Sequence, residues 1–189
     1  MSNTPRWRDG STDFGWISIL LHWIGAAAVL ILLLIGNSIH SANINSDSAL
    51  RAHTTLGLSV YVLLWLRILW RVRHKHPGPL PRQPKLLFAI AKPFHYLLIV
   101  AVAVMLVTGP LMAWAGALPL RLGNIGIPSP FPVSVELFEL LHTAHATAAK
   151  ILGWGTLLHV LAVILHAAIH RDGSFDKMLA PSRQHQSFS

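Results

Sequence analysis

Twelve histidines, in a chain of 189 residues that is 53% hydrophobic, are the side chains best suited to do chemistry. Two of them, His145 and His159, lie 14 residues apart in the long apolar stretch between Leu140 and His170. In an α-helix, that spacing places both rings on one face and roughly 21 Å apart along the axis. Such a helix can hold two metal centres stacked across a membrane, provided that other helices supply a second ligand to each.

The composition narrows the kind of metal centre. The chain contains no cysteine, which excludes disulfides, thiolate zinc sites, iron–sulfur clusters and covalently attached c-type haem. Only 12% of the residues are charged, whereas soluble domains usually contain about 25%. With a positive mean hydropathy, this indicates a membrane protein, in which any metal is bound by histidine, carboxylate or methionine.

The sequence predicts four membrane spans. They cover roughly residues 16–38, 50–70, 94–114 and 140–169, each long enough to cross a bilayer. A short polar loop, a proline-rich basic loop at 71–92 and a Gly- and Pro-containing segment at 115–136 connect them; this last segment could be a short interfacial segment or a lid. We therefore expect an all-α, integral-membrane, antiparallel four-helix bundle forming one domain over residues 1–189.

The placement of basic residues predicts the orientation of the bundle. The N-terminal tail, the 71–92 loop and the C-terminal tail hold most of them: Arg6, Arg8, Arg71, Arg73, Lys75, Arg82, Lys85, Lys92, Arg171, Lys177 and Arg183. The other two loops and their edges hold only Arg51 and Arg121. By the positive-inside rule, both termini are cytoplasmic and the protein lies in a bacterial inner membrane. Topology and anionic lipid thus account for the net charge of +8, and nucleic-acid binding is not expected.

Helix direction assigns a depth to each histidine within a span. The first helix runs outward, so His22 lies toward the cytoplasm, whereas the second and fourth run inward, so His53 and His145 are outer and His159 is inner. The predicted pairs are His53 with His145 and His22 with His159. Two axial imidazoles saturate a haem iron and make it an electron carrier. A non-redox membrane protein that binds metal through histidine, such as a metal transporter, is the alternative.

Three further residues bear on the haem interpretation. Gly57 follows His53 by one turn and would let a macrocycle approach the backbone, although small residues are also common in ordinary helix packing. Arg67 follows His53 by 14 residues, on the same face; it could pair with haem propionates or extend to the cytoplasmic surface. His95, at the start of the third span, could bind a propionate or a quinone, or simply lie at the interface.

Several short motifs in a fixed order carry a family resemblance. They are ILLHW around His22, AHTTLG around His53 with Arg67 following, His95 with Gly109 14 residues later, and the His145 to His159 spacing followed by HAAIHRDG. Together they resemble the bacterial cytochrome b561 family, whose fold is shared with cytochrome b subunits of nickel–iron hydrogenases and formate dehydrogenases. The resemblance covers roughly residues 14–175 and implies two b-type haems ligated by the four paired histidines. An acidic residue often follows the first fourth-helix histidine in this family, whereas here it is Ala146.

The resemblance also implies an activity, because single-chain members of the family include superoxide oxidases, which pass electrons from superoxide to ubiquinone. Lys150, about one turn past His145, together with Arg51 and Arg121, would place three cations around the outer haem to attract a small anion. Lys150 can equally be read as a propionate partner. We therefore expect an oxidoreductase that transfers electrons from superoxide to quinone.

Other partners follow from the same reading. Trp16, Ser18, His95 and His166 lie near the cytoplasmic haem level and could frame a quinone headgroup. The alternative function is a cytochrome b membrane subunit that passes electrons between quinone and a soluble redox partner such as a hydrogenase or a cytochrome c. Membrane lipid surrounds the protein in either case, and a homo-oligomer is compatible with the sequence.

Overall fold

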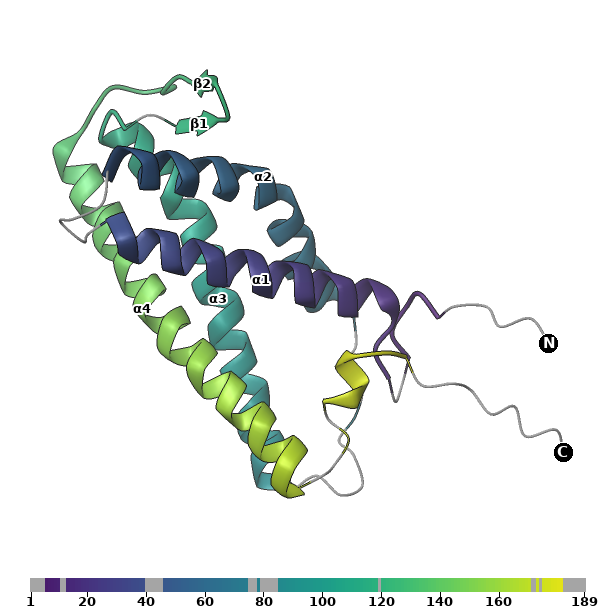
Figure 1. The fold of residues 1–189 in the computed structure, drawn as a ribbon. Coiled ribbons are helices and arrows are strands. Elements are labelled where there is room, and N and C mark those ends of the chain that lie inside the picture. Colours follow the sequence, from purple (N-terminus) through teal and green to yellow (C-terminus); the bar gives the residue numbers. More distant parts are fainter. Residues whose placement is uncertain are drawn as a thin grey trace, which may run out of the picture.

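Four long helices dominate the computed structural model (Figure 1), which describes residues 6–10, 13–39, 46–74, 78, 85–118, 120–170, 173 and 175–181. The helices are α1 (Trp16–Ile39), α2 (Ser46–Arg73), α3 (Lys85–Ala115) and α4 (Val135–Leu165). Each is long and apolar enough to cross a membrane. The chain is therefore a multi-pass membrane protein. Four basic residues used for the orientation lie outside the described residues: Lys75, Arg82, Arg171 and Arg183.

The helices form two antiparallel pairs. Most contacts between helices lie within the α1–α2 pair and within the α3–α4 pair. The two pairs approach each other at the end that carries the strands β1 and β2 and diverge toward the end that carries both termini (Figure 1). We call these the β-hairpin end and the terminal end. The arrangement is thus two helix pairs that lean apart, rather than an evenly packed bundle.

The buried core is small, as the membrane environment allows. Its buried apolar side chains are largely alanines with a few leucines, such as Leu64, Leu106 and Leu152. Many larger apolar side chains on the four helices are exposed, among them Leu34, Val62 and Trp154. In a bilayer these face lipid, so helix association rests on close packing of small residues rather than on burial of apolar area.

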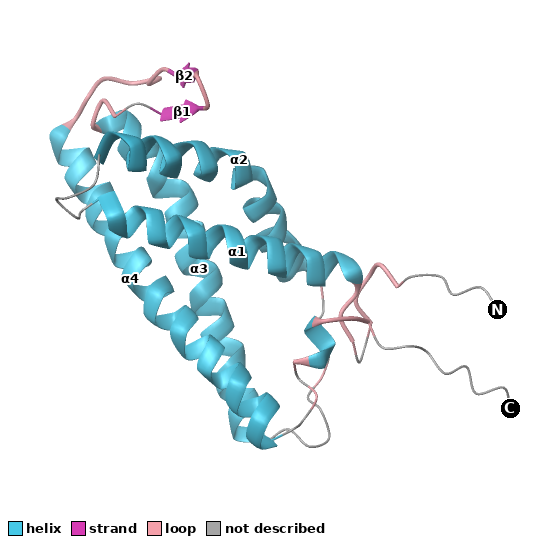
Figure 2. Ribbon diagram, in the orientation of Figure 1, coloured by secondary structure: helices cyan, strands magenta, loops and turns pink. Residues whose placement is uncertain are grey.

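A short β-hairpin covers one end of the helices (Figure 2). Strand β1 (Leu120–Leu122) pairs antiparallel with β2 (Ile125–Ile127), with Arg121 opposite Gly126. Gly123 has φ of 61°, a left-handed conformation that glycine adopts without strain and that tight hairpin turns require. Strand β1 packs against α2. The segment 115–136 thus contains a hairpin that joins one helix pair to the other.

Helix α1 begins where the first predicted span begins, whereas the other three helices begin before the apolar runs that predict their spans. Helix α2 begins at Ser46 rather than near 50, and α3 begins at Lys85 rather than near 94, with Pro93 and Pro110 in its interior. Helix α4 begins at Val135, because the hydroxyl of Ser134 accepts a hydrogen bond from the Leu137 N–H (3.3 Å) and caps the helix. These first turns contain polar residues or proline, so a search for apolar runs starts the helices too late.

Helix α4 is followed by a π-helical turn at His166–His170 and a short 3₁₀ helix at Asp176–Met178. The indole N–H of Trp23 on α1 donates to the carbonyl of Met178 (2.7 Å). This bond holds the C-terminal segment against α1 at the terminal end.

Gly155 provides a test of how α3 and α4 pack. A Cβ at Gly155 would lie 2.5 Å from Cδ2 of Leu98, whereas a Cβ at Gly153 would meet nothing within 4 Å. We expect Gly155→Val to lower the free energy of unfolding by about 1–3 kcal/mol through overpacking. Gly153→Val makes the same chemical change two residues away and is the control. Thermal denaturation of the protein in detergent measures both, and equal midpoints for the two variants would contradict this packing.

Candidate metal centres between the helix pairs

Two pairs of histidines meet across the gap between the helix pairs. The ring centres of His22 on α1 and His159 on α4 are 6.3 Å apart, and those of His53 on α2 and His145 on α4 are 6.4 Å apart. Two imidazoles that bind one metal from opposite sides, each at about 2 Å, have ring centres roughly 6 Å apart. Both spacings therefore suit a metal held between two rings. The structure brings together the same partners that helix direction and depth predict.

The number of ligands in each centre indicates the kind of metal. A bare transition-metal ion in a protein usually has three or four protein ligands. Within the described residues, no group of three or more His, Cys, Asp or Glu side chains is placed to hold an ion. A haem iron already has four porphyrin nitrogens and needs only two axial ligands. Two imidazoles without a third side chain placed to bind the metal therefore fit haem better than a bare ion.

Hydrogen bonds place the ring proton of His145 on Nδ1. The hydroxyl of Thr108 on α3 donates to the carbonyl of Val104 (2.7 Å) and lies 2.9 Å from Nδ1 of His145. A hydroxyl has one proton to donate, so Thr108 accepts from the His145 Nδ1–H. The Nε2 lone pair is then free to bind a metal. This is the support that metal-binding histidines commonly receive from a neighbouring acceptor.

Glycines let both histidines at the β-hairpin end approach the neighbouring helix. A Cβ at Gly36 on α1 would lie 3.2 Å from Cε1 of His53, and a Cβ at Gly109 on α3 would lie 3.4 Å from Cε1 of His145. Nδ1 of His53 is buried and has no hydrogen bond of ordinary geometry, although the backbone of Leu32 lies beside it. Next to Gly57, by contrast, an added Cβ would make only ordinary contact, at 3.9 Å from Leu32.

Arg67 lies beside the His22–His159 pair, at the depth that its spacing from His53 indicates. Its guanidinium is 3.3 Å from Nδ1 of His22. It fits there because residue 25 is glycine: a Cβ at Gly25 would lie 2.6 Å from a guanidinium nitrogen of Arg67. Arginine only donates hydrogen bonds, so in this arrangement Nδ1 of His22 accepts and Nε2 holds the ring proton. Ligation through Nε2 would require Arg67 to release His22 and bind another acceptor, for which a haem propionate is suited.

A third imidazole adjoins the same pair. His95 on α3 lies edge-on to His159, with ring centres 5.2 Å apart. It comes from a different helix than either member of the pair, so α1, α3 and α4 all contribute a histidine at this depth. The sequence left open whether His95 contacts a cofactor or only the interface, and the structure places it against a candidate ligand.

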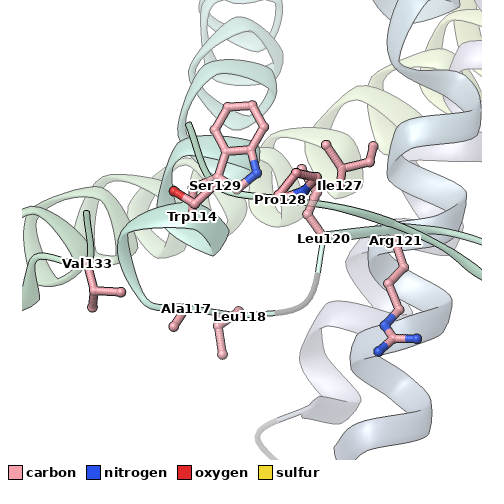
Figure 3. A pocket seen from close by; sticks show the side chains of 10 residues that line it. Trp114, Ala117, Leu118, Leu120, Arg121, Ile127, Pro128, Ser129 and Val133 are labelled. Carbon is pink, nitrogen blue, oxygen red and sulfur yellow. The ribbon is translucent and has the colours of Figure 1, made fainter. Parts of the chain in front are cut away.

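The three cations proposed to surround the other pair lie on three different elements: Arg51 on α2, Arg121 on β1 and Lys150 on α4. Arg51 is exposed at the start of α2, and Arg121 lies on β1 with its side chain extending toward α2 (Figure 3). Lys150 is exposed. Lys150 follows His145 by five residues. The resulting rotation of about 500°, equivalent to about 140° around the helix axis, places Lys150 away from the histidine face of α4.

A cavity of about 470 Å³ lies beneath the β-hairpin (Figure 3). Its walls are largely apolar and include Trp114, Leu120 and Ile127, with Arg121 at its edge. The ring of Trp114 packs edge-on against Phe131, with ring centres 5.9 Å apart, and its Nε1 is buried without a hydrogen bond. No feature of the sequence indicated this cavity, because it depends on the hairpin folding over the end of α3.

Comparison with known proteins gives these features a context. The model of the prokaryotic cytochrome b561 family matches residues 13–181. The chain is 25% identical over 191 residues to Cytochrome b561 homolog 2 of Escherichia coli (strain K12), covering 96% of this chain and 95% of the relative. It is 23% identical over 177 residues to a protein of Yersinia pestis named Probable superoxide oxidase CybB, covering 90% and 97%. The similarity thus extends over nearly the whole of each chain.

Alanine substitutions test whether the histidines work as pairs. If each ring pair holds one haem iron, we expect His53→Ala and His145→Ala to lose one and the same haem signal, and His22→Ala and His159→Ala to lose the other. Absorbance and paramagnetic resonance spectra of the purified variants distinguish the two signals. His142→Ala, one turn before His145 and stacked on Phe138, is the control and should keep both. Loss of different haems within one pair would overturn the pairing.

Thr108 offers a second test. Thr108→Val keeps the shape of the side chain but removes the acceptor for His145, so a haem held by the His53–His145 pair would bind about 10–100-fold more weakly. Thr108→Ser keeps the hydroxyl and should retain wild-type affinity. Haem titration of the protein monitored by absorbance measures both variants. Equal affinity in Thr108→Val and Thr108→Ser would show that the hydroxyl has no role in positioning the ring.

Proposed function

The chain belongs to the prokaryotic cytochrome b561 family of haem b-binding membrane electron-transfer proteins, and we propose that it carries electrons from superoxide to ubiquinone through two b-type haems. One haem is bound by His53 and His145 and the other by His22 and His159. The β-hairpin end faces the outside of a bacterial inner membrane, and both termini face the cytoplasm. The concentration of basic residues at the terminal end supports this orientation.

The arrangement of the two histidine pairs is the observation that carries the proposal. His145 and His159 lie on one helix, and their 14-residue spacing sets the two centres roughly 21 Å apart along its axis. Each haem, when bound, supplies a one-electron couple. His53 with His145, and His22 with His159, would hold these groups, so that substrates would exchange electrons with them without binding the iron. The protein would then direct the electrons along α4.

The negative charge of superoxide complements the positive charge at the β-hairpin end. It is a small anion that needs only to approach a haem edge, and Arg51 and Arg121 place positive charge at this end. Lys150 adds a third cation within the span, from the outward face of α4. Oxidation of two superoxide ions releases two O₂ molecules and two electrons, which with two protons reduce one ubiquinone to ubiquinol. The similarity to a protein named as a probable superoxide oxidase agrees with this reaction.

A second candidate is electron exchange between quinone and a soluble redox protein. The exposed apolar side chains of the β-hairpin and the segment after it favour it: Ile125 is 67% exposed and Val133 59% exposed. A docked protein would cover these side chains, although lipid at the membrane surface would also do so. In this case, superoxide would not reduce the haems rapidly, whereas an added redox protein would.

Rapid mixing with superoxide tests the proposal. Superoxide should reduce the oxidised haems in the wild-type protein. Arg51→Gln, Arg121→Gln and Lys150→Gln should each lower the second-order rate constant by at least about threefold at low ionic strength, with less effect at high salt, because each removes attraction for the anion.

Arg73→Gln, at the terminal end of α2, is the control and should leave the rate constant unchanged. Absence of haem reduction in the wild-type protein would contradict the superoxide reaction itself. Unchanged rate constants in all three variants would remove the steering role, and an unchanged rate constant in Lys150→Gln alone would confine it to the two arginines.

A further inference from the structure

The proposed reaction consumes protons at the terminal end, where quinone is reduced. Each ubiquinone takes up two electrons and two protons to become ubiquinol, so this end must admit protons as well as electrons. The two histidine pairs account for the electron path only. Residues that supply these protons would serve that proposed reaction, on which their role depends.

A chain of hydrogen bonds runs from helix α2 to the N-terminal segment at this end. The indole Nε1–H of Trp70 donates to the hydroxyl of Ser18 on α1 (2.8 Å), and the Ser18 hydroxyl donates to Oδ2 of Asp9 (2.7 Å). The other carboxylate oxygen, Oδ1, accepts from the backbone N–H of Gly15 (2.8 Å). Trp70 only donates and the carboxylate only accepts, so the Ser18 hydroxyl links a fixed donor to a group that can take up a proton.

These hydrogen bonds lie one helical turn from the His22–His159 centre. Ser18 precedes His22 by four residues on α1, and Trp70 follows Arg67 by three residues on α2, so both fall on the faces that carry the centre. One helical turn corresponds to about 5.4 Å along the axis. The Ser18 hydroxyl is therefore placed between the electron-transfer centre and Asp9, which is partly exposed in the segment before α1.

The N-terminal segment holds Asp9 in place by its own contacts. The backbone carbonyls of Arg6 and Trp7 accept from the N–H groups of Trp16 and Ile17 (3.1 and 3.2 Å), which are the free donors at the start of α1. A Cβ at Gly15 would lie 2.4 Å from the carbonyl oxygen of Trp7, so the segment approaches closely because residue 15 is glycine. Asp9 is thus fixed at the end of a membrane helix rather than carried on an unattached tail.

The charged groups around Asp9 come from two elements. Arg71 on α2 interacts electrostatically with Asp9, and its side chain also lies over the ring of Phe14 (5.9 Å). In the N-terminal segment itself, Arg6 pairs with the other acidic residue, Asp13, at 3.9 Å. Asp13 therefore shares the segment and the charge of Asp9 but pairs with Arg6, whereas Asp9 bonds to Ser18. The two aspartates form a natural matched pair for an experiment.

We propose that Asp9 supplies protons to the quinone reduced at the terminal end, with the Ser18 hydroxyl as the relay. Protonated Asp9 gives its proton to the Ser18 oxygen as the Ser18 O–H bond breaks and that proton forms the new O–H bond on the reduced quinone oxygen. Water on the cytoplasmic side then returns a proton to Asp9. Two such transfers accompany the two electrons that form one quinol, so charge and atoms balance.

The test separates electron entry from proton-coupled exit. The haem-loaded protein is reduced with dithionite, freed of excess reductant and mixed with a soluble ubiquinone analogue, and haem oxidation is followed in H₂O and in D₂O. Asp9→Asn should slow this oxidation at least about tenfold, since general acid catalysis commonly contributes 10²–10⁴-fold. A small weak acid such as acetic acid should restore part of the rate. The absorbance spectrum and the rate of haem reduction by superoxide should stay within about twofold of wild type, because neither needs a proton from Asp9.

Asp13→Asn is the control and should oxidise at the wild-type rate. Wild-type rate and isotope effect in Asp9→Asn would overturn the proton role while leaving the proposed function intact. Failure of the wild-type protein to be oxidised by quinone would instead contradict the proposed function. If Asp9→Asn loses haem through misfolding, Ser18→Ala makes the same comparison: a slowed oxidation that weak acid does not restore supports the relay, and a wild-type rate overturns it.

Discussion

Imidazole rings from opposite helix pairs meet at two depths, and the association of the helix pairs depends on the contacts at these two places. Within each pair, small residues let helices pack closely, as Gly155 does against Leu98. Between the pairs, the buried apolar core is sparse, and the pairs diverge toward the terminal end (Figure 1). A group held by two imidazoles would link α4 to α1 and to α2. Its binding energy would then contribute directly to the association of the helix pairs.

The two centres differ in ways that bear on the direction of electron flow. At the His53–His145 centre, His145 is supported by a neutral hydroxyl, that of Thr108 (2.9 Å). At the His22–His159 centre, the guanidinium of Arg67 lies 3.3 Å from His22. A nearby positive charge stabilises the reduced iron, which carries one positive charge less than the oxidised iron, and so raises its potential. In the proposed function, such an asymmetry would favour electron movement toward the terminal end, where quinone would be reduced.

Properties fixed by helix geometry could be predicted from the sequence, whereas those fixed by contacts between helices could not. The alternating direction of four spans and a constant rise per residue were sufficient to place His22 opposite His159 and Arg67 at the same depth. The roles of Gly25 and Gly36 depend on which side chain of another helix approaches them, which spacing cannot reveal. The β-hairpin was missed because three-residue strands carry too little periodicity.

The N-terminal segment shows why polar residues next to a membrane span merit the same attention as those within it. Composition alone marks residues 1–15 as a polar tail whose Arg6 and Arg8 help to set topology. Yet Arg6 and Trp7 satisfy the first N–H groups of α1, and Asp9 bonds to Ser18. Helix starts leave donors that need partners, so a segment that supplies them becomes part of the structure. The same segment that closes the end of the helix also places the Asp9 carboxylate against Ser18, one turn before His22.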